Sequence, residues 1–378
     1  MSLTNQRELF EIPDQITYLN CAYMSPLLRA AREAGQVAIA RKSTPWRIAA
    51  RDFFEDSETA RRLFAELISA DADGVALIPA ASYGLSLAAA NLPMRPGQRI
   101  MLLEDEFPSN VYPWRDLAAR VGGSVEVVAR PDDFDWTRTL LERIDDRTAV
   151  VAVPNCHWTD GSLVDLGRVG KRAHEVGAAL VVDATQSLGA APFDVGTVQP
   201  DFLVAASYKW LLGPYSLGFV YVAPPHRAGR PLEFNWIARE DSEDFAGLVN
   251  YRDVFQPGAR RFDVGERSNF ALLPMAMVAL RQILDWRVEE VAATLGELTA
   301  HIEREGQRLS LHATPSARRA AHMIGLRSDT PLSPDLPARL AAANVYVSVR
   351  GNSIRVSPHL YNAAEDVDRL VSALAGAL

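Results

Sequence analysis

Short apolar runs alternate with segments of helical periodicity between residues 75 and 222, and this alternation restricts the possible folds more than any other feature. The apolar runs predict strands at 75–78, 99–103, 124–128, 149–153, 179–183, 202–205 and 218–222. Helices are predicted between them, including 82–92, 110–121, 137–143 and 165–176. Strands that alternate with crossover helices predict an α/β fold, with a mostly parallel seven-stranded sheet covered by helices.

The pattern changes near Pro257. Two long helices are predicted there, at 272–286 and 288–309, followed by a strand at 321–326, a helix at 335–343, strands at 346–349 and 353–356, and a closing helix at 365–377. We therefore predict an N-terminal segment (1–20), a large domain (21–256) and a smaller α+β domain (257–378). Ligands of such proteins bind at the carboxyl ends of the parallel strands or between domains.

Composition excludes several classes of protein. The net charge of −8 argues against a surface for nucleic acid or anionic membrane. Two cysteines provide no disulfide framework, and neither a signal peptide nor a membrane-spanning run is present, so we expect a soluble cytoplasmic protein. Dinucleotide-binding, phosphate-loop and standard zinc motifs are missing, and no metal site is predicted.

Lysine occurs at only three positions, Lys42, Lys171 and Lys209. Lys42 and Lys171 stand among polar or charged neighbours, whereas Lys209 follows a predicted strand and is flanked by aromatic and apolar residues. Asp183 ends another predicted strand, 26 residues earlier. Because one short crossover fits between them, both side chains are expected at the same edge of the sheet.

A lysine and a carboxylate at one sheet edge suit pyridoxal 5′-phosphate (PLP). Only a lysine amine can hold this cofactor as a Schiff base, and a buried carboxylate keeps its pyridine nitrogen protonated. The simpler interpretation is that Asp183 caps a helix and Lys209 lies on the surface. The apolar neighbours of Lys209 disfavour it, since an unpaired lysine among them would cost desolvation free energy.

The segments D-A-T-Q-S (183–187) and S-Y-K-W (207–210) resemble the class V aminotransferase family of fold-type I PLP-dependent enzymes. This family includes cysteine desulfurases, kynureninases, selenocysteine lyases and isopenicillin-N epimerase-like proteins. The resemblance covers nearly the whole chain and implies a large PLP-binding domain followed by a smaller C-terminal domain.

The resemblance also implies which residues bind the cofactor. Ala81 and Ser82 would form a phosphate cup at the start of a helix, although Ser82 could simply cap that helix. Phe107 would stack on the cofactor ring, although an apolar residue is more often core. The other implied contacts are Asn155 and Gln186 to the phenolic oxygen and Tyr208 to the phosphate.

Further residues are implied for the substrate and for a partner subunit. Arg355, in the segment S-I-R-V-S-P-H-L-Y-N (353–362), would bind the substrate α-carboxylate, and Arg350 could share or replace that role. Tyr23 and His157 are predicted to contact the substrate, and His157 is also an alternative to Asn155 for the position beside the cofactor. Ser268 and Asn269 would cross to the partner's phosphate in a homodimer, or belong to an ordinary polar loop.

The reaction type is less constrained. A cysteine desulfurase needs a cysteine on a mobile loop of the C-terminal domain, and none follows Cys156, which argues against that activity. The simplest hypothesis is an aminotransferase acting on the α-carbon of an amino acid. A lyase or an epimerase is the alternative. A non-catalytic PLP-fold binding protein is disfavoured because Asp183, Lys209 and Arg355 are all present.

Overall fold

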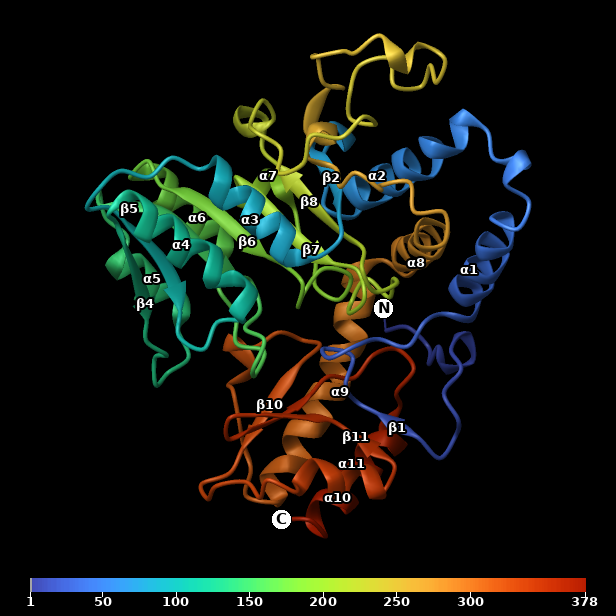
Figure 1. Cartoon of the computed structure of the whole chain (residues 1–378). Coiled ribbons are helices and arrows are strands. Elements are labelled where there is room, and N and C mark those ends of the chain that lie inside the picture. Colours follow the sequence, from blue (N-terminus) through green and yellow to red (C-terminus); the bar gives the residue numbers. More distant parts are fainter. Residues whose placement is uncertain (1) are drawn as a thin grey trace.

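Seven strands form the central sheet of the molecule, which a computed structural model describes from residue 2 to residue 378 (Figure 1). In order across the sheet they are β2 (Val75–Ile78), β8 (Gly218–Val222), β7 (Phe202–Ala206), β6 (Ala179–Asp183), β5 (Thr148–Pro154), β3 (Arg99–Leu103) and β4 (Ser124–Val128). β8 runs antiparallel to both of its neighbours, and the other pairs are parallel. The predicted α/β fold with a mostly parallel seven-stranded sheet is confirmed.

Helices cover both faces of this sheet, which explains why its inner strands are mostly apolar. In β2, Val75 and Leu77 enter the apolar core on one face, while Ala76 and Ile78 enter the core on the other. The first core is closed by α2 (Glu55–Leu67), α5 (Trp136–Arg143), α6 (Leu166–Glu175) and α8 (Leu272–Trp286), and the second by α3 (Ala81–Asn91) and α4 (Tyr112–Val121). The predicted helices in this region match these elements closely.

A smaller antiparallel sheet lies in the C-terminal part, below the large sheet in Figure 1. Its strands are β12 (Ser348–Arg350), β13 (Ser353–Val356), β10 (Ile324–Arg327) and β9 (His312–Ala313), and α9 (Val288–Arg308), α10 (Leu336–Ala342) and α11 (Ala364–Ala375) accompany it. The strand predicted at 346–349 is instead divided between β11 (Val345–Tyr346) and β12. The chain divides there because β11 pairs with a different strand from β12.

The N-terminal segment joins this C-terminal part. β1 (Thr17–Tyr18) pairs in parallel with β11, and Leu19 lies in the apolar core of the small sheet. The backbone N–H of Cys21 then donates to the Ser357 carbonyl, at 3.1 Å. These contacts bring the chain from the small sheet to the candidate site, which the residues directly after Cys21 help to line. α1 (Arg29–Arg41) comes next and packs on α8.

Two long helices connect the two parts. α8 packs against α1 and α2. In α9, Leu295 belongs to the apolar core of the large sheet, whereas Ile302 belongs to the core of the small sheet. The domain boundary predicted at residue 257 stays a prediction. α8, which follows that boundary, packs against the large sheet. Within residues 2–378, no helix combines the length and apolar character needed to cross a membrane.

Candidate active site

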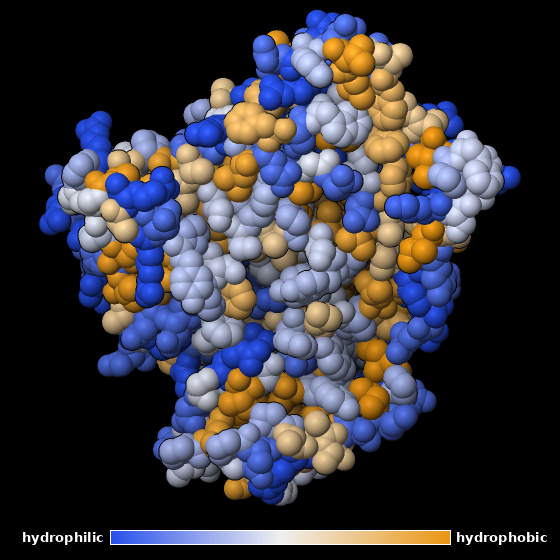
Figure 2. Space-filling view, viewed as in Figure 1, coloured by the Kyte–Doolittle hydropathy of each residue, from blue (hydrophilic) through white to orange (hydrophobic). Residues whose placement is uncertain are grey.

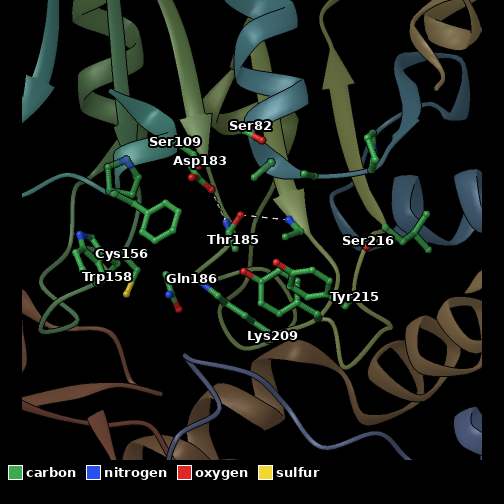
Figure 3. Close-up of a pocket in the computed structure, with 18 of the residues that line it drawn as sticks. Ser82, Ser109, Cys156, Trp158, Asp183, Thr185, Gln186, Lys209, Tyr215 and Ser216 are labelled. Carbon is green, nitrogen blue, oxygen red and sulfur yellow. Dashed lines mark hydrogen bonds between the residues drawn. The ribbon is translucent and has the colours of Figure 1, made fainter. Parts of the chain in front are cut away.

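A cavity of about 260 Å³ opens at the carboxyl ends of β6 and β7. Figure 3 shows Asp183, Thr185, Gln186 and Lys209 around one space, with Ser82 at the start of α3. Predicted residues that line it are Ala81, Ser82, Phe107, Asp183, Gln186, Tyr208 and Lys209. The fold therefore brings these separate parts of the chain together, as a parallel sheet does with the residues that follow its strands.

Lys209 lies in the turn after β7 with only 7% of its surface exposed. Its Nζ atom is 5.4 Å from the ring centre of Phe107 and 5.6 Å from that of Tyr208. Burial, followed by the positive charge of Arg355, lowers the pKa of Lys209 to about 8. The amine is thus more often neutral, and more nucleophilic, than a lysine in water.

Asp183 ends β6 and faces the same cavity. Its Oδ1 accepts a hydrogen bond from the backbone N–H of Thr185, at 3.0 Å, and the Thr185 hydroxyl accepts one from the Ala206 N–H, at 3.2 Å. Thr185 therefore fixes the carboxylate relative to the end of β7. Burial raises the pKa of Asp183, so a cation beside this carboxylate would favour its ionised form.

The start of α3 forms another wall of the cavity. Ala81 is the first residue of this helix, and no side chain caps it, so backbone N–H groups of the first turn remain available to an anion. Gly84 lets the helix approach the sheet: a Cβ atom there would lie 2.9 Å from side-chain atoms of Ile78 and Val204. This close packing holds the helix N-terminus beside the ends of the strands.

Phe107 lines the cavity, and its ring meets that of Trp158 edge-on, with ring centres 5.5 Å apart. Sequence reasoning did not single out the neighbouring Glu106. Its Oε1 accepts from the Phe107 N–H, at 2.7 Å, while Oε2 is buried without a partner. Burial and the nearby charge of Asp183 raise the pKa of Glu106 to about 8. A second buried carboxyl group thus stands beside Asp183, protonated over much of the neutral range.

Gln186 follows Asp183 by three residues and is held by two hydrogen bonds. Its side-chain amide donates to the Ala22 carbonyl, at 3.1 Å, and accepts from the indole N–H of Trp210, at 3.0 Å. These bonds join the N-terminal segment to the turn that carries Lys209. Since the amide nitrogen has a second N–H, Gln186 keeps a donor for a ligand in the cavity.

Asn155 and His157 are not among the residues that line the cavity, whereas Pro154, Cys156 and Trp158 are. The reason is alternation: successive side chains of extended backbone point to opposite sides. His157 is buried, with Nε2 3.0 Å from the Glu104 carbonyl and Nδ1 2.8 Å from the Thr159 hydroxyl. Burial lowers its pKa to about 4, so it stays neutral. His157 thus does not line this cavity, whereas its neighbour Trp158 does, and the substrate contact predicted for His157 stays a prediction.

Arg355 and Tyr23 line an adjoining hollow of about 320 Å³ that also contains Lys209, Phe107 and Arg350. Arg355 is 1% exposed, and its Nη1 donates to the Trp158 carbonyl, at 2.8 Å. Its Nε and Nη2 atoms are buried without any partner among the described residues. Two free donors on one side of a guanidinium match the two oxygens of a carboxylate.

Ser268 and Asn269 lie elsewhere. They line a separate hollow of about 420 Å³. The Asn269 side chain accepts from the backbone N–H groups of Ala271 and Leu272, and the Ser268 hydroxyl donates to the Phe53 carbonyl. Within one chain, therefore, neither residue reaches the cavity around Lys209, and their predicted contact with a partner's phosphate stays a prediction.

Comparison with known proteins agrees with this geometry. The profile of the family described as aminotransferase class-V matches residues 47–370. A Bacillus subtilis (strain 168) protein described as the uncharacterized aminotransferase YcbU is 27% identical over 373 residues, covering 98% of this chain and 96% of that protein. Isopenicillin N epimerase from Streptomyces clavuligerus is 27% identical over 342 residues, covering 83% of each chain.

A solved structure also shares the fold. It is a C-DES variant described as having glycine covalently linked to the PLP cofactor, and it superposes with a TM-score of 0.89 at 18% identity, over 98% of this chain and 99% of that one. The family match spans most of the sequence and includes every residue of the cavity described above. The protein therefore belongs to the aminotransferase class-V family of PLP-dependent enzymes.

Proposed function

We propose that this protein is an aminotransferase that removes the amino group of a free amino acid, with PLP held on Lys209. One observation carries the proposal: Lys209, Asp183 and Arg355 converge on two adjoining hollows that share Lys209. Lys209 supplies an amine for covalent attachment, Asp183 a carboxylate for a ring nitrogen, and Arg355 a guanidinium for a substrate carboxylate.

The residues around the cavity fit this cofactor part by part. The first turn of α3, with Ser82 and Tyr208, would hold the phosphate, Asp183 the pyridine nitrogen, and Gln186 the phenolic oxygen. Phe107 would cover one face of the ring. When bound, PLP withdraws electrons from the bonds at the substrate α-carbon.

Lys209 also serves as the base in this proposal. With its amine free, Lys209 would take the proton from the substrate α-carbon and, as transamination requires, return it to the cofactor carbon on the other side of the substrate nitrogen. Phe107 offers a phenyl ring on the other face, and a phenyl ring carries no exchangeable proton. This arrangement favours one base over the pair of opposed bases that a two-base epimerisation would use.

The cysteines support a reaction other than sulfur transfer. Cys21 and Cys156 are both buried, and burial raises the pKa of each thiol well above its ordinary value. Sulfur transfer needs a thiolate that can leave and enter the site. Cys156 does line the cavity, where it contributes a small apolar surface.

Product analysis tests the proposal. The holoenzyme is incubated with single amino acids and a 2-oxo acid acceptor, and the products are identified by mass spectrometry. An aminotransferase forms the 2-oxo acid of the donor in an amount equal to the new amino acid. Ammonia, a cleaved side chain or the opposite enantiomer, formed without an acceptor, would contradict it.

The pKa of Lys209 gives a pH prediction. Only the neutral amine attacks the cofactor aldehyde, so the rate at which the protein stripped of cofactor binds added PLP covalently should rise about tenfold per pH unit below 8 and level off above it. The plateau above pH 8 follows from the lowered pKa of Lys209, because the rate for a lysine with its ordinary pKa of 10.5 would still rise at pH 10. Stopped-flow absorbance measures this profile, and a plateau that begins only above pH 10 would contradict the account.

We also propose a homodimer. Large apolar side chains are exposed on α1, in the turn that follows it and in the loop after β8, and Figure 2 shows apolar colours in the region where Figure 1 places these segments. They include Val37, Ile39, Trp46, Phe234, Trp236, Phe245, Val249 and Tyr251. Patches of this kind mark interfaces. Light scattering should give twice the chain mass of 41.5 kDa, and a monomer at micromolar concentration would refute the dimer. A cytoplasmic location stays a prediction.

A further inference from the structure

Two arginines on one face of a hairpin stand beside Lys209. In the hairpin of β12 and β13, Arg355 pairs with Ser348, and Arg350 pairs with Ser353. Residues that pair, or that alternate along a strand, point to the same face, so Arg350 and Arg355 are diagonal neighbours there, with Cβ atoms roughly 7–8 Å apart in such a pairing. Both line the hollow that Lys209 shares.

The positive charges of these two arginines are not neutralised within the chain. Among residues 2–378, neither guanidinium forms an ion pair with a carboxylate, and both bond only to backbone carbonyls, Arg350 to that of Val349 and Arg355 to that of Trp158. Arg130 and Arg327 lie close by and differ, because each is paired with Asp160. Arg350 lines both the hollow that contains Arg130 and Arg327 and the hollow that contains Lys209, whereas Arg355 lines only the latter of these two.

One carboxylate does not need both arginines. Nε and Nη2 of Arg355 already supply two free donors, which is the complement of a single carboxylate. Arg350 lies beyond this group, with its guanidinium over the ring of Trp158, 5.5 Å from the ring centre. Arg350 is itself partly exposed, and Tyr23, which lines the same hollow, is 56% exposed, so this hollow is open to a ligand from solvent.

We infer that the preferred substrate is an amino acid with a second acidic group, whose α-carboxylate binds Arg355 and whose side-chain anion binds Arg350. This inference rests on the proposed function and names the substrate class for the same site. It assigns Arg350 the role of selecting the substrate by charge. The chemistry recognised is a dicarboxylic amino acid or a close analogue, such as a sulfinate.

Isosteric pairs test the inference, because aspartate and asparagine, or glutamate and glutamine, differ in charge but hardly in shape. The holoenzyme should show a kcat/KM about 10–100-fold higher for the acid than for its amide. Arg350→Gln should remove most of this preference by raising KM for the acid alone, and Arg350→Lys should restore part of it. Arg355→Ala should raise KM for acid and amide alike.

Two controls separate the possible results. Arg304→Gln removes an exposed arginine of α9 and should leave the preference unchanged. Calorimetry of succinate and butyrate binding to the holoenzyme needs no turnover, and succinate should bind more tightly unless Arg350 is replaced. If the enzyme turned over amino acids without preferring the acids, or if Arg350→Gln lowered kcat/KM equally for acid and amide, this inference would be overturned and the proposed function would not. Arg350-dependent succinate binding with no turnover of any amino acid would support this recognition and overturn the proposed function.

Discussion

Replacing Lys209 with alanine is expected to abolish both the covalent attachment of PLP and turnover. The side chain is the one buried lysine of the site, burial lowers its pKa to about 8, so about half of the amine is neutral at that pH, and it is proposed both to anchor the cofactor and to move the α-proton. General base catalysis alone contributes about 10²–10⁴-fold, and loss of the anchor adds to this. We therefore expect kcat to fall by at least about 10⁴-fold, measured with the best amino acid and acceptor.

Lys171→Ala is the matched control, because Lys171 lies exposed on α6 and the substitution removes the same atoms. It should keep the absorption of the bound cofactor and the full rate. Thermal unfolding of both variants checks that the fold survives. If Lys209→Ala retained turnover near the wild-type rate, the attachment site and the base would both have been assigned wrongly.

Replacing Asp183 with asparagine should lower kcat by about 10²–10⁴-fold while PLP stays attached. Asp183 is buried, oriented by Thr185 and placed at the end of β6. Asparagine keeps the shape but cannot hold a proton on a ring nitrogen by ion pairing. Removing one partner of a buried ion pair costs about 3–5 kcal/mol, which corresponds to this loss of rate if the pair is needed in the transition state.

Asp165→Asn provides the comparison. Asp165 caps α6 by accepting from the Arg168 N–H, and asparagine caps a helix about as well as aspartate. This variant should react at the wild-type rate. An Asp183→Asn enzyme with unchanged kcat would show that the carboxylate does not act on the ring. Loss of bound PLP in that variant would instead point to a structural role for Asp183.

The fold was predictable because both faces of the large sheet are covered. Burial on both faces makes the inner strands short apolar runs, and the edge strand β4, although only partly buried, keeps three valines, so all seven strands could be recognised in the sequence. Asp183 and Lys209 were predictable for a related reason, since polar residues directly after such runs must lie at the sheet edge. The pairing of β1 with β11 was not, because these strands have two residues each and their partners are far apart in the chain.

The parts of the site that were missed depend on the direction of side chains. Between Pro154 and Trp158, the resemblance implied Asn155, with His157 as its alternative, but the backbone turns Cys156 and Trp158 toward the cavity. Glu106 was overlooked beside Phe107, since the sequence does not reveal that a carboxyl group is buried next to Asp183. The role predicted for Ser268 and Asn269 requires a second subunit and stays a prediction, because no pattern in one chain describes a partner's surface.

The absorption spectrum of the purified protein, supplied with PLP and then with single amino acids, tests the central claim most directly. We predict a visible band from PLP bound to Lys209, which dialysis does not remove and which one class of amino acid bleaches. A 2-oxo acid added afterwards should restore the band, because transamination runs in both directions. If no band formed at any PLP concentration, or if no amino acid altered it, the proposal that this site transfers amino groups would be contradicted.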